Sequence, residues 1–122
     1  MRVLIVDAAN VVGSRPTGWW RDRAGAAAKL HARLVRAELD YDRIVLVLEG
    51  AARDGHPAGI HDRVETTHAP GSGDDAIVGE ARTRGDSGDE VVVVTADRAL
   101  RERVENVGAS CIGPSSLLDR LA

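Results

Sequence analysis

The chain has 122 residues and a net charge of −3, with 43% hydrophobic and 29% charged residues. This length predicts one domain, residues 1–122, with a core of its own, and the composition excludes a disordered chain. No apolar run is long enough to span a bilayer. The negative balance excludes binding of polyanions through the overall field, so any contact with nucleic acid must be local.

The N-terminal segment and the cysteine content indicate where the protein is expected to work. Asp7 follows the first apolar run at once and leaves no room for a signal-peptide apolar region. The single cysteine, Cys111, excludes an intrachain disulfide, and its position beside Ile112 favours a buried structural thiol. We therefore expect a cytoplasmic protein with no membrane partner.

Apolar segments predict the strands of a sheet. Residues 3–6, 44–48 and 91–94 are continuous and rich in β-branched side chains, and a shorter segment lies at 111–112. Continuous rather than alternating runs are typical of parallel strands that helices cover on both faces. Residues 63–67 are expected to form a less buried strand, and residues 50–62 a loop or a poorly formed short helix.

Helical patterns alternate with these strands. Small and aliphatic side chains recur at helical spacing over residues 22–39, and residues 74–84 form a second amphipathic segment. A third helix is predicted from its N-cap, Asp97, to its C-terminal stop at Gly108, and a short closing helix over 114–122. The alternation predicts an α/β fold of three layers with a central, mainly parallel sheet.

Acidic residues follow the predicted strands. Ligand sites of open parallel sheets lie outside the carboxyl ends of the strands, so we expect these side chains to meet at one edge. Crowded carboxylates repel one another, and a hard cation such as Mg²⁺ or Mn²⁺ neutralises such a cluster. A divalent metal site of this kind suits phosphodiester hydrolysis. The carboxylates concerned are Asp7, Glu49, Asp74, Asp75 and Asp97.

Each of these residues also has a structural alternative. Asp7 and Asn10 form an Asp-x-x-Asn turn, in which both side chain types commonly accept hydrogen bonds from the backbone. The alternatives for the others are a helix cap for Asp74 and Asp97, a helix-dipole contact for Asp75, an ion pair for Glu49 and an ordinary strand-end hydroxyl for Thr95.

Three short motifs combine these residues. They are Val-Asp-Ala-Ala-Asn (6–10), Gly-Asp-Asp-Ala-Ile (73–77) and Val-Val-Thr-Ala-Asp-Arg (93–98). In order and spacing they resemble the NYN domains of the PIN-like nuclease superfamily, specifically the bacterial YacP-like group, over nearly the whole chain. The resemblance implies a three-layer PIN-like (Rossmannoid) fold and a metal-dependent ribonuclease. By motif it implies that Asp7, Asn10, Asp74 and Asp97 are the catalytic residues.

Two positions depart from the pattern of this superfamily. Many relatives have a further acid soon after the Thr-x-Asp motif, where this chain has Arg98-Ala99-Leu100-Arg101. The Leu-Glu-Gly at 48–50 resembles a Phe-Asp-Gly of related domains, and the longer Glu49 is expected to reach a metal only through water. A catalytically weak RNA-binding or protein-interaction module therefore stays an alternative, as does a nucleotide phosphohydrolase.

A basic and aromatic segment follows the Asp7 turn and is expected to border the site. Indoles stack on unpaired bases and guanidinium groups contact phosphates, a combination typical of single-stranded RNA binding. The alternative for the tryptophans is anchoring the first helix in the core, because the chain has no phenylalanine. The substrate candidates are Arg15, Trp19, Trp20, Arg21 and Arg23, with Arg53, Thr95 and Arg98 from other loops.

The histidines stay outside the predicted site. His56, His61 and His68 match no compact zinc-binding spacing, and histidines in exposed loops are common. The prediction is therefore a ribonuclease in which one or two Mg²⁺ or Mn²⁺ ions are held by acids and act on RNA, with a homodimer left open. The metal ligands are Asp7, Asp74 and Asp97, assisted by Asp75 and Glu49.

Overall fold

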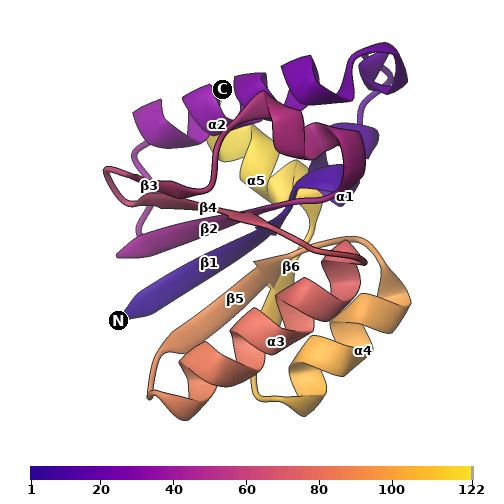
Figure 1. The fold of residues 1–122 in the computed structure, drawn as a ribbon. Helices are drawn as coiled ribbons and strands as arrows, with labels where there is room; N and C mark the ends of the chain where they lie inside the picture. The colour runs from indigo at the N-terminus through magenta and orange to yellow at the C-terminus, as the bar shows by residue number, and fades with distance from the viewer. Residues whose placement is uncertain (122) are drawn as a thin grey trace.

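The computed structural model describes residues 1–121 and contains a six-stranded sheet of order β3-β4-β2-β1-β5-β6 (Figure 1). Every neighbouring pair of strands is parallel except β3 and β4, which are antiparallel. The predicted mainly parallel sheet is therefore confirmed. The strands are β1 (Arg2–Asp7), β2 (Arg43–Leu48), β3 (Gly59–His61), β4 (Val64–His68), β5 (Glu90–Val94) and β6 (Ser110–Ile112).

Helices cover both faces of the sheet, which completes the predicted three layers (Figure 1). On one face lie α1 (Ala8–Gly13), α2 (Arg23–Arg36) and α5 (Pro114–Leu121), and on the other α3 (Gly73–Asp86) and α4 (Arg98–Asn106). Two short 3₁₀ helices, η1 (Trp19–Arg21) and η2 (Gly50–Gly55), lie in the connections. The closing helix was expected to reach Ala122, which lies outside the described residues.

Side chains of each buried strand divide between two cores. In β1, Leu4 and Val6 pack with the helices of the α2 side, whereas Val3 and Ile5 pack with those of the α3 side. Successive side chains of a strand point to opposite faces, so Asp7 falls on the α3 side. This alternation decides which helices the site residues at the strand ends will meet.

Several elements differ from the sequence prediction. The six-residue α1 is too short to show helical periodicity, and the three residues of β3 are exposed and carry no apolar pattern. Residues 50–62 were expected to be a loop or poor helix, and they contain η2 followed by β3. Gly108 has a φ of +93°, which confirms it as the C-terminal stop after α4. No helix within residues 1–121 is long and apolar enough to cross a membrane.

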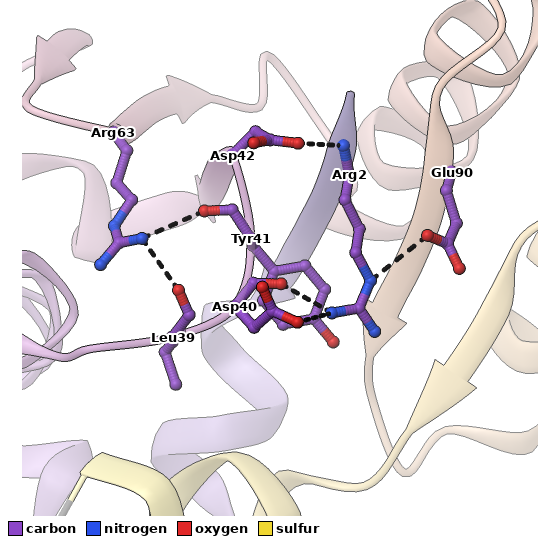
Figure 2. A network of polar contacts seen from close by, with 7 residues as sticks. All are labelled: Arg2, Leu39, Asp40, Tyr41, Asp42, Arg63 and Glu90. Atoms are coloured by element: carbon purple, nitrogen blue, oxygen red, sulfur yellow. Dashed lines mark hydrogen bonds and ion pairs between the residues drawn. The ribbon is translucent and has the colours of Figure 1, made fainter.

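Arginines tie the connections together at the amino ends of the strands (Figure 2). Arg63 donates to the backbone carbonyls of Ala37, Leu39 and Tyr41, at 3.1, 2.8 and 3.2 Å. Arg2 bridges the acidic side chains of Asp40 and Glu90. This network holds the connections at the amino ends of the strands, whereas the predicted site residues lie at the carboxyl ends.

Candidate active site

Asp7 ends the central strand and begins α1. Its side chain is 5% exposed, and its Oδ1 accepts a hydrogen bond of 3.3 Å from the backbone N–H of Asn10, as a helix N-cap does. Asp7 therefore has the capping role that the sequence offers as its structural alternative, and the cap uses Oδ1. Burial at the carboxyl end of the strands makes Asp7 the innermost acid of the site.

Thr95 and Asp97 connect the end of β5 to Asp7. The Thr95 hydroxyl donates to Asp7 Oδ2 at 3.1 Å and accepts from the backbone N–H of Asp97 at 3.1 Å. Asp97 is the N-cap of α4, and its Oδ1 accepts from the backbone N–H of Leu100 at 3.0 Å. One hydroxyl therefore fixes the position of two acids from different strands.

Asn10 links α1 to the same loop. Its Oδ1 accepts a hydrogen bond of 2.8 Å from the backbone N–H of Ala96, between Thr95 and Asp97. The Asn10 side chain thus orients the loop that carries Asp97. A positioning role is what the structure gives this residue.

Glu49 and Asp74 face each other where β2 ends and α3 begins. Glu49 Oε2 accepts a hydrogen bond of 2.9 Å from the backbone N–H of Gly73. A Cβ at Gly73 would lie 2.8 Å from Glu49 Oε1, so a larger residue there would displace the Glu49 carboxylate from its present position. Asp74, the next residue, lies in the first turn of α3.

The charges of these acids act on one another. Burial raises the pKa of Asp7 to about 6, although hydrogen bonds from Asn10 and Thr95 oppose the rise; the charges of Asp74 and Glu49 add to it. Burial also raises the pKa of Asp74, and the nearby charges of Asp97, Glu49 and Asp75 act in the same direction. Acids from four connections therefore converge, as the sequence predicts.

The donor set fits a hard divalent cation. Within residues 1–121, no salt bridge joins Asp7, Glu49, Asp74 or Asp97 to a basic side chain. In the same part of the chain, no three of these carboxylates have oxygens all within 4.8 Å of one another. As placed, these acids can offer one ion at most two carboxylates as direct ligands, and water would have to fill the remaining positions.

Asp75 points to a different partner. Its Oδ1 forms an ion pair of 2.9 Å with Arg103 of α4, and its side chain is exposed. The positive charge of Arg103 also opposes the rise in the pKa of Asp74. Sequence analysis does not identify Arg103, because nothing local to α4 shows that this face meets the start of α3.

A cavity of about 290 Å³ adjoins the acidic cluster. Trp19, Arg23 and Glu49 line it, together with small residues of α1 and η2. The Arg23 guanidinium lies 5.3 Å from the centroid of the Trp19 ring, within the range of cation–π attraction. Two predicted substrate residues are therefore brought beside one of the predicted acids.

A second cavity, of about 360 Å³, is also lined by Trp19. Its lining includes Arg15, Lys29 and Arg33, and it shares Trp19 and Val12 with the first. Lys29 and Arg33 were not among the predicted substrate residues, although their helical spacing on α2 is a readable signal. Basic side chains therefore lie in both cavities that Trp19 lines, and Glu49 lines the first of them.

The remaining predicted substrate residues lie in varied places. The Arg53 guanidinium donates hydrogen bonds to the backbone carbonyls of Gly50 and Ala69, at 3.1 and 3.5 Å. Arg21 lies 5.9 Å from the ring centroid of Trp20, which is 54% exposed, and Arg98 is exposed at the start of α4.

Three expectations need correction. Thr95 is completely buried with its hydroxyl engaged on both sides, so it positions Asp7 and does not contact substrate. Neither Trp19 nor Trp20 belongs to the buried core: Trp20 is exposed and Trp19 is partly buried, and the two rings form an edge-to-face pair 6.0 Å apart. Cys111 is only half-buried, since β6 is an edge strand.

Comparison with known proteins identifies this fold. No protein-family model matches the sequence, and a search of curated proteins finds no match. Among solved structures, the W164L mutant of Rae1 (YacP) from Bacillus subtilis matches with a TM-score of 0.78 at 20% identity, over 99% of this chain and 75% of that one. Rae1 (YacP) without that mutation matches with a TM-score of 0.75 at 19% identity, over 99% and 74%. The chain therefore has the same three-layer α/β fold as these Rae1 (YacP) structures.

Proposed function

We propose that this protein is a metal-dependent ribonuclease that hydrolyses phosphodiester bonds of single-stranded RNA. The observation that carries the proposal is the buried carboxylate of Asp7, whose pKa is raised in part by the charges of Asp74 and Glu49, and which has no salt bridge to a basic side chain within residues 1–121. An uncompensated buried acid is unfavourable unless a cation neutralises it, and strongly shifted pKa values gather at functional sites.

Mg²⁺ or Mn²⁺ is the proposed cofactor. Asp7, Asp74 and Asp97 would hold one or two such ions, with no more than two of these carboxylates bound directly to the same ion, and Glu49 and Asp75 would assist directly or through water. When bound, such an ion supplies Lewis-acid activation of water and stabilises the charge that develops on the phosphate. The oxygen-only donor set is the type that these hard cations prefer.

Hydrogen bonds within the chain hold Asp7 and Asp97 in place. Hydrogen bonds from Thr95 and Asn10 favour the ionised form of Asp7, and the Thr95 hydroxyl aligns the loop of Asp97 with it. In the reaction, water adds to phosphorus while the bond from phosphorus to the leaving oxygen breaks. No nucleophilic side chain is required.

RNA is favoured as substrate by the surface beside the acids. Trp19 offers a half-exposed indole on which a base can stack, and Arg23, Arg15 and Lys29 can contact phosphates along the two cavities. Stacking requires unpaired bases, which favours single strands over duplexes. These local basic side chains also account for RNA binding by a chain whose net charge is negative.

The test is cleavage of end-labelled single-stranded RNA by the purified protein with Mn²⁺, Mg²⁺ or chelator. Single-stranded DNA and nucleoside triphosphates are included as competing substrate classes. We expect RNA to be cut only with metal, and the Asp7→Asn and Asp97→Asn variants to lose this activity. Asp119→Asn, an exposed change on α5 far along the chain from the acids, is the matched control purified in the same way.

Contaminating ribonuclease is the main hazard, and the variants detect it. Equal cutting by the wild type and the Asp97→Asn protein would contradict the proposal. RNA binding with no metal-dependent cutting would identify a binding module instead, and hydrolysis of the triphosphates alone would identify a nucleotide phosphohydrolase.

A further inference from the structure

Three of the four histidines come together away from the acidic cluster. His31 belongs to α2, His56 follows η2, and His61 ends β3. One ligand nitrogen from each lies within 4.8 Å of the others. We propose that these three imidazoles form a second metal site, which binds a divalent transition metal of the Zn²⁺ class and fastens α2 to the β3 hairpin.

His31 is the buried member of the group. The residue is 5% exposed, and within residues 1–121 its Nε2 has no hydrogen-bond partner. A buried polar atom without a partner is costly, and structures with such atoms call for an explanation such as an unseen ion. Burial lowers the pKa of His31, with smaller contributions from His56 and His61, so the neutral ring keeps a lone pair that a metal can use.

His56 stacks on His31 and has a fixed tautomer. The two ring centroids are 3.6 Å apart with 19° between the planes. His56 Nδ1 lies 2.9 Å from the carbonyl oxygen of Pro57, which can only accept, so Nδ1 carries the proton. The neutral ring then has its lone pair on Nε2. A backbone carbonyl holding the second ring nitrogen is the arrangement found around metal-binding histidines.

The surrounding chain is built to seat His56 against α2. A Cβ on Gly55 would overlap the carbonyl of Ala24 and lie 2.9 Å from the Cβ of Ala27, so only glycine allows this close approach. The fourth histidine, His68, places its Nε2 2.7 Å from the carbonyl oxygen of His56. All four histidines therefore take part in one local structure.

His61 completes the group from the solvent side. Its ring centroid is 5.8 Å from that of His31, and its Nε2 lies 3.8 Å from the carboxylate of Asp62 in the turn between β3 and β4. Because His61 is exposed, its side chain can move toward the other two rings until one of its nitrogens reaches a shared Zn²⁺ ion, at a Zn–N distance of about 2.0–2.1 Å.

Three nitrogen donors and no carboxylate among them select a borderline transition metal over Mg²⁺. Zn²⁺ accepts three histidines with water as fourth ligand. His31 is 25 residues before His56 in the chain, and His61 follows five residues after His56, so the ion would cross-link α2 to the η2 connection and β3. The histidine site shares no residue with the acidic cluster, so the proposed metal site does not depend on the proposed ribonuclease activity.

The test measures Zn²⁺ binding to the full chain without a histidine tag. After chelator treatment and dialysis, Zn²⁺ is titrated in competition with a chromophoric chelator, and Tm is recorded with Zn²⁺ or Mg²⁺ alone. We expect one equivalent of Zn²⁺ per chain, and a rise in Tm of roughly 10 °C at a hundredfold excess over Kd. Mg²⁺ should give no such rise through this site.

Variants assign the bound ion to this site. His61→Ala, at an exposed position, and His56→Ala should each weaken Zn²⁺ binding at least tenfold, and His31→Gln keeps a polar side chain if alanine there prevents folding. Cys111→Ser and Asp97→Asn should bind like the wild type. The proposal is overturned if less than half an equivalent binds, if His61→Ala and His56→Ala bind normally, or if Asp97→Asn abolishes binding.

Discussion

The hydroxyl of Thr95 donates a hydrogen bond of 3.1 Å to the carboxylate of Asp7, across a separation of 88 residues in the chain. It joins the ends of two neighbouring parallel strands inside the protein. The same oxygen accepts from the backbone N–H of Asp97, so the two acids are held in a fixed relationship before any ligand binds. Preorganisation of this kind is what a catalytic site requires.

Thr95→Val should therefore damage the site without changing its shape. The hydrogen bond from Thr95 lowers the pKa of Asp7, so its removal should raise that pKa above about 6. The acidic limb of the pH–rate profile should then move to higher pH. Loss of a buried hydrogen bond should destabilise the protein by about 1–3 kcal/mol. Thr95→Ser keeps the hydroxyl and should restore the profile; an unchanged profile in Thr95→Val would rule out the positioning role.

Asp7→Asn should abolish RNA cleavage, by more than about 100-fold, yet stabilise the metal-free protein. A carboxyl whose pKa is raised on folding destabilises the native state above that pKa, and the effect disappears as the pH falls toward its unfolded value. We expect Asp7→Asn to be more stable by about 2–3 kcal/mol at pH 7.5, and by less than about 1 kcal/mol at pH 4. Urea unfolding in chelator measures both values. A gain that is equal at the two pH values would show that Asp7 ionisation is not its cause.

Arg103→Gln tests the electrostatic support of α3 by α4. Arg103 opposes the rise in the pKa of Asp74, so its loss should shift the acidic limb of the pH–rate profile to higher pH. The exposed pair with Asp75 should contribute less than about 1 kcal/mol to stability. Arg101→Gln on the same helix removes an equal charge and is the control. Identical profiles for the two variants would mean that the position of Arg103 is irrelevant.

Trp19→Ala should weaken RNA binding more than Trp20→Ala, because Trp19 lines both cavities and Trp20 lines neither. Loss of one stacked base corresponds to about 1–3 kcal/mol of binding free energy. Binding of a short single-stranded RNA is measured by fluorescence anisotropy in the Asp97→Asn background, which separates affinity from cleavage. Trp19→Phe should recover most of the affinity. Equal losses from both tryptophans would place the RNA elsewhere.

Arg63→Met should destabilise the fold and spare the activity of the folded protein. Its guanidinium serves three backbone carbonyls at the edge of the sheet opposite the acids, and leaving them unpaired should cost about 1–3 kcal/mol. Arg2→Met breaks more exposed ion pairs and should change stability by less than about 1 kcal/mol. The urea midpoint and the specific activity at low temperature provide the two measurements.

Sequence by itself determined the elements whose signals are local. Buried parallel strands need continuous apolar runs, and the N-cap at Asp97 and the left-handed Gly108 are contacts within a few residues, so β1, β2, β5 and α4 were predictable. Because ligand sites of open parallel sheets lie at the carboxyl ends of the strands, the sequence was enough to predict that Asp7, Asp74 and Asp97 lie at the same edge of the sheet. Periodicity could not reveal the short α1 or the exposed β3.

Tertiary structure alone decided how those residues are used. Whether Thr95 faces substrate or Asp7, whether Asp75 meets a metal or Arg103, and whether His31 meets His56 all depend on how helices cross over the sheet. Such contacts join positions far apart in the chain, and no local pattern encodes them. The sequence determines which chemical groups are present and where each lies along the chain. The packing of the helices on the sheet determines which of these groups come into contact, and the energy of each side chain depends on those contacts.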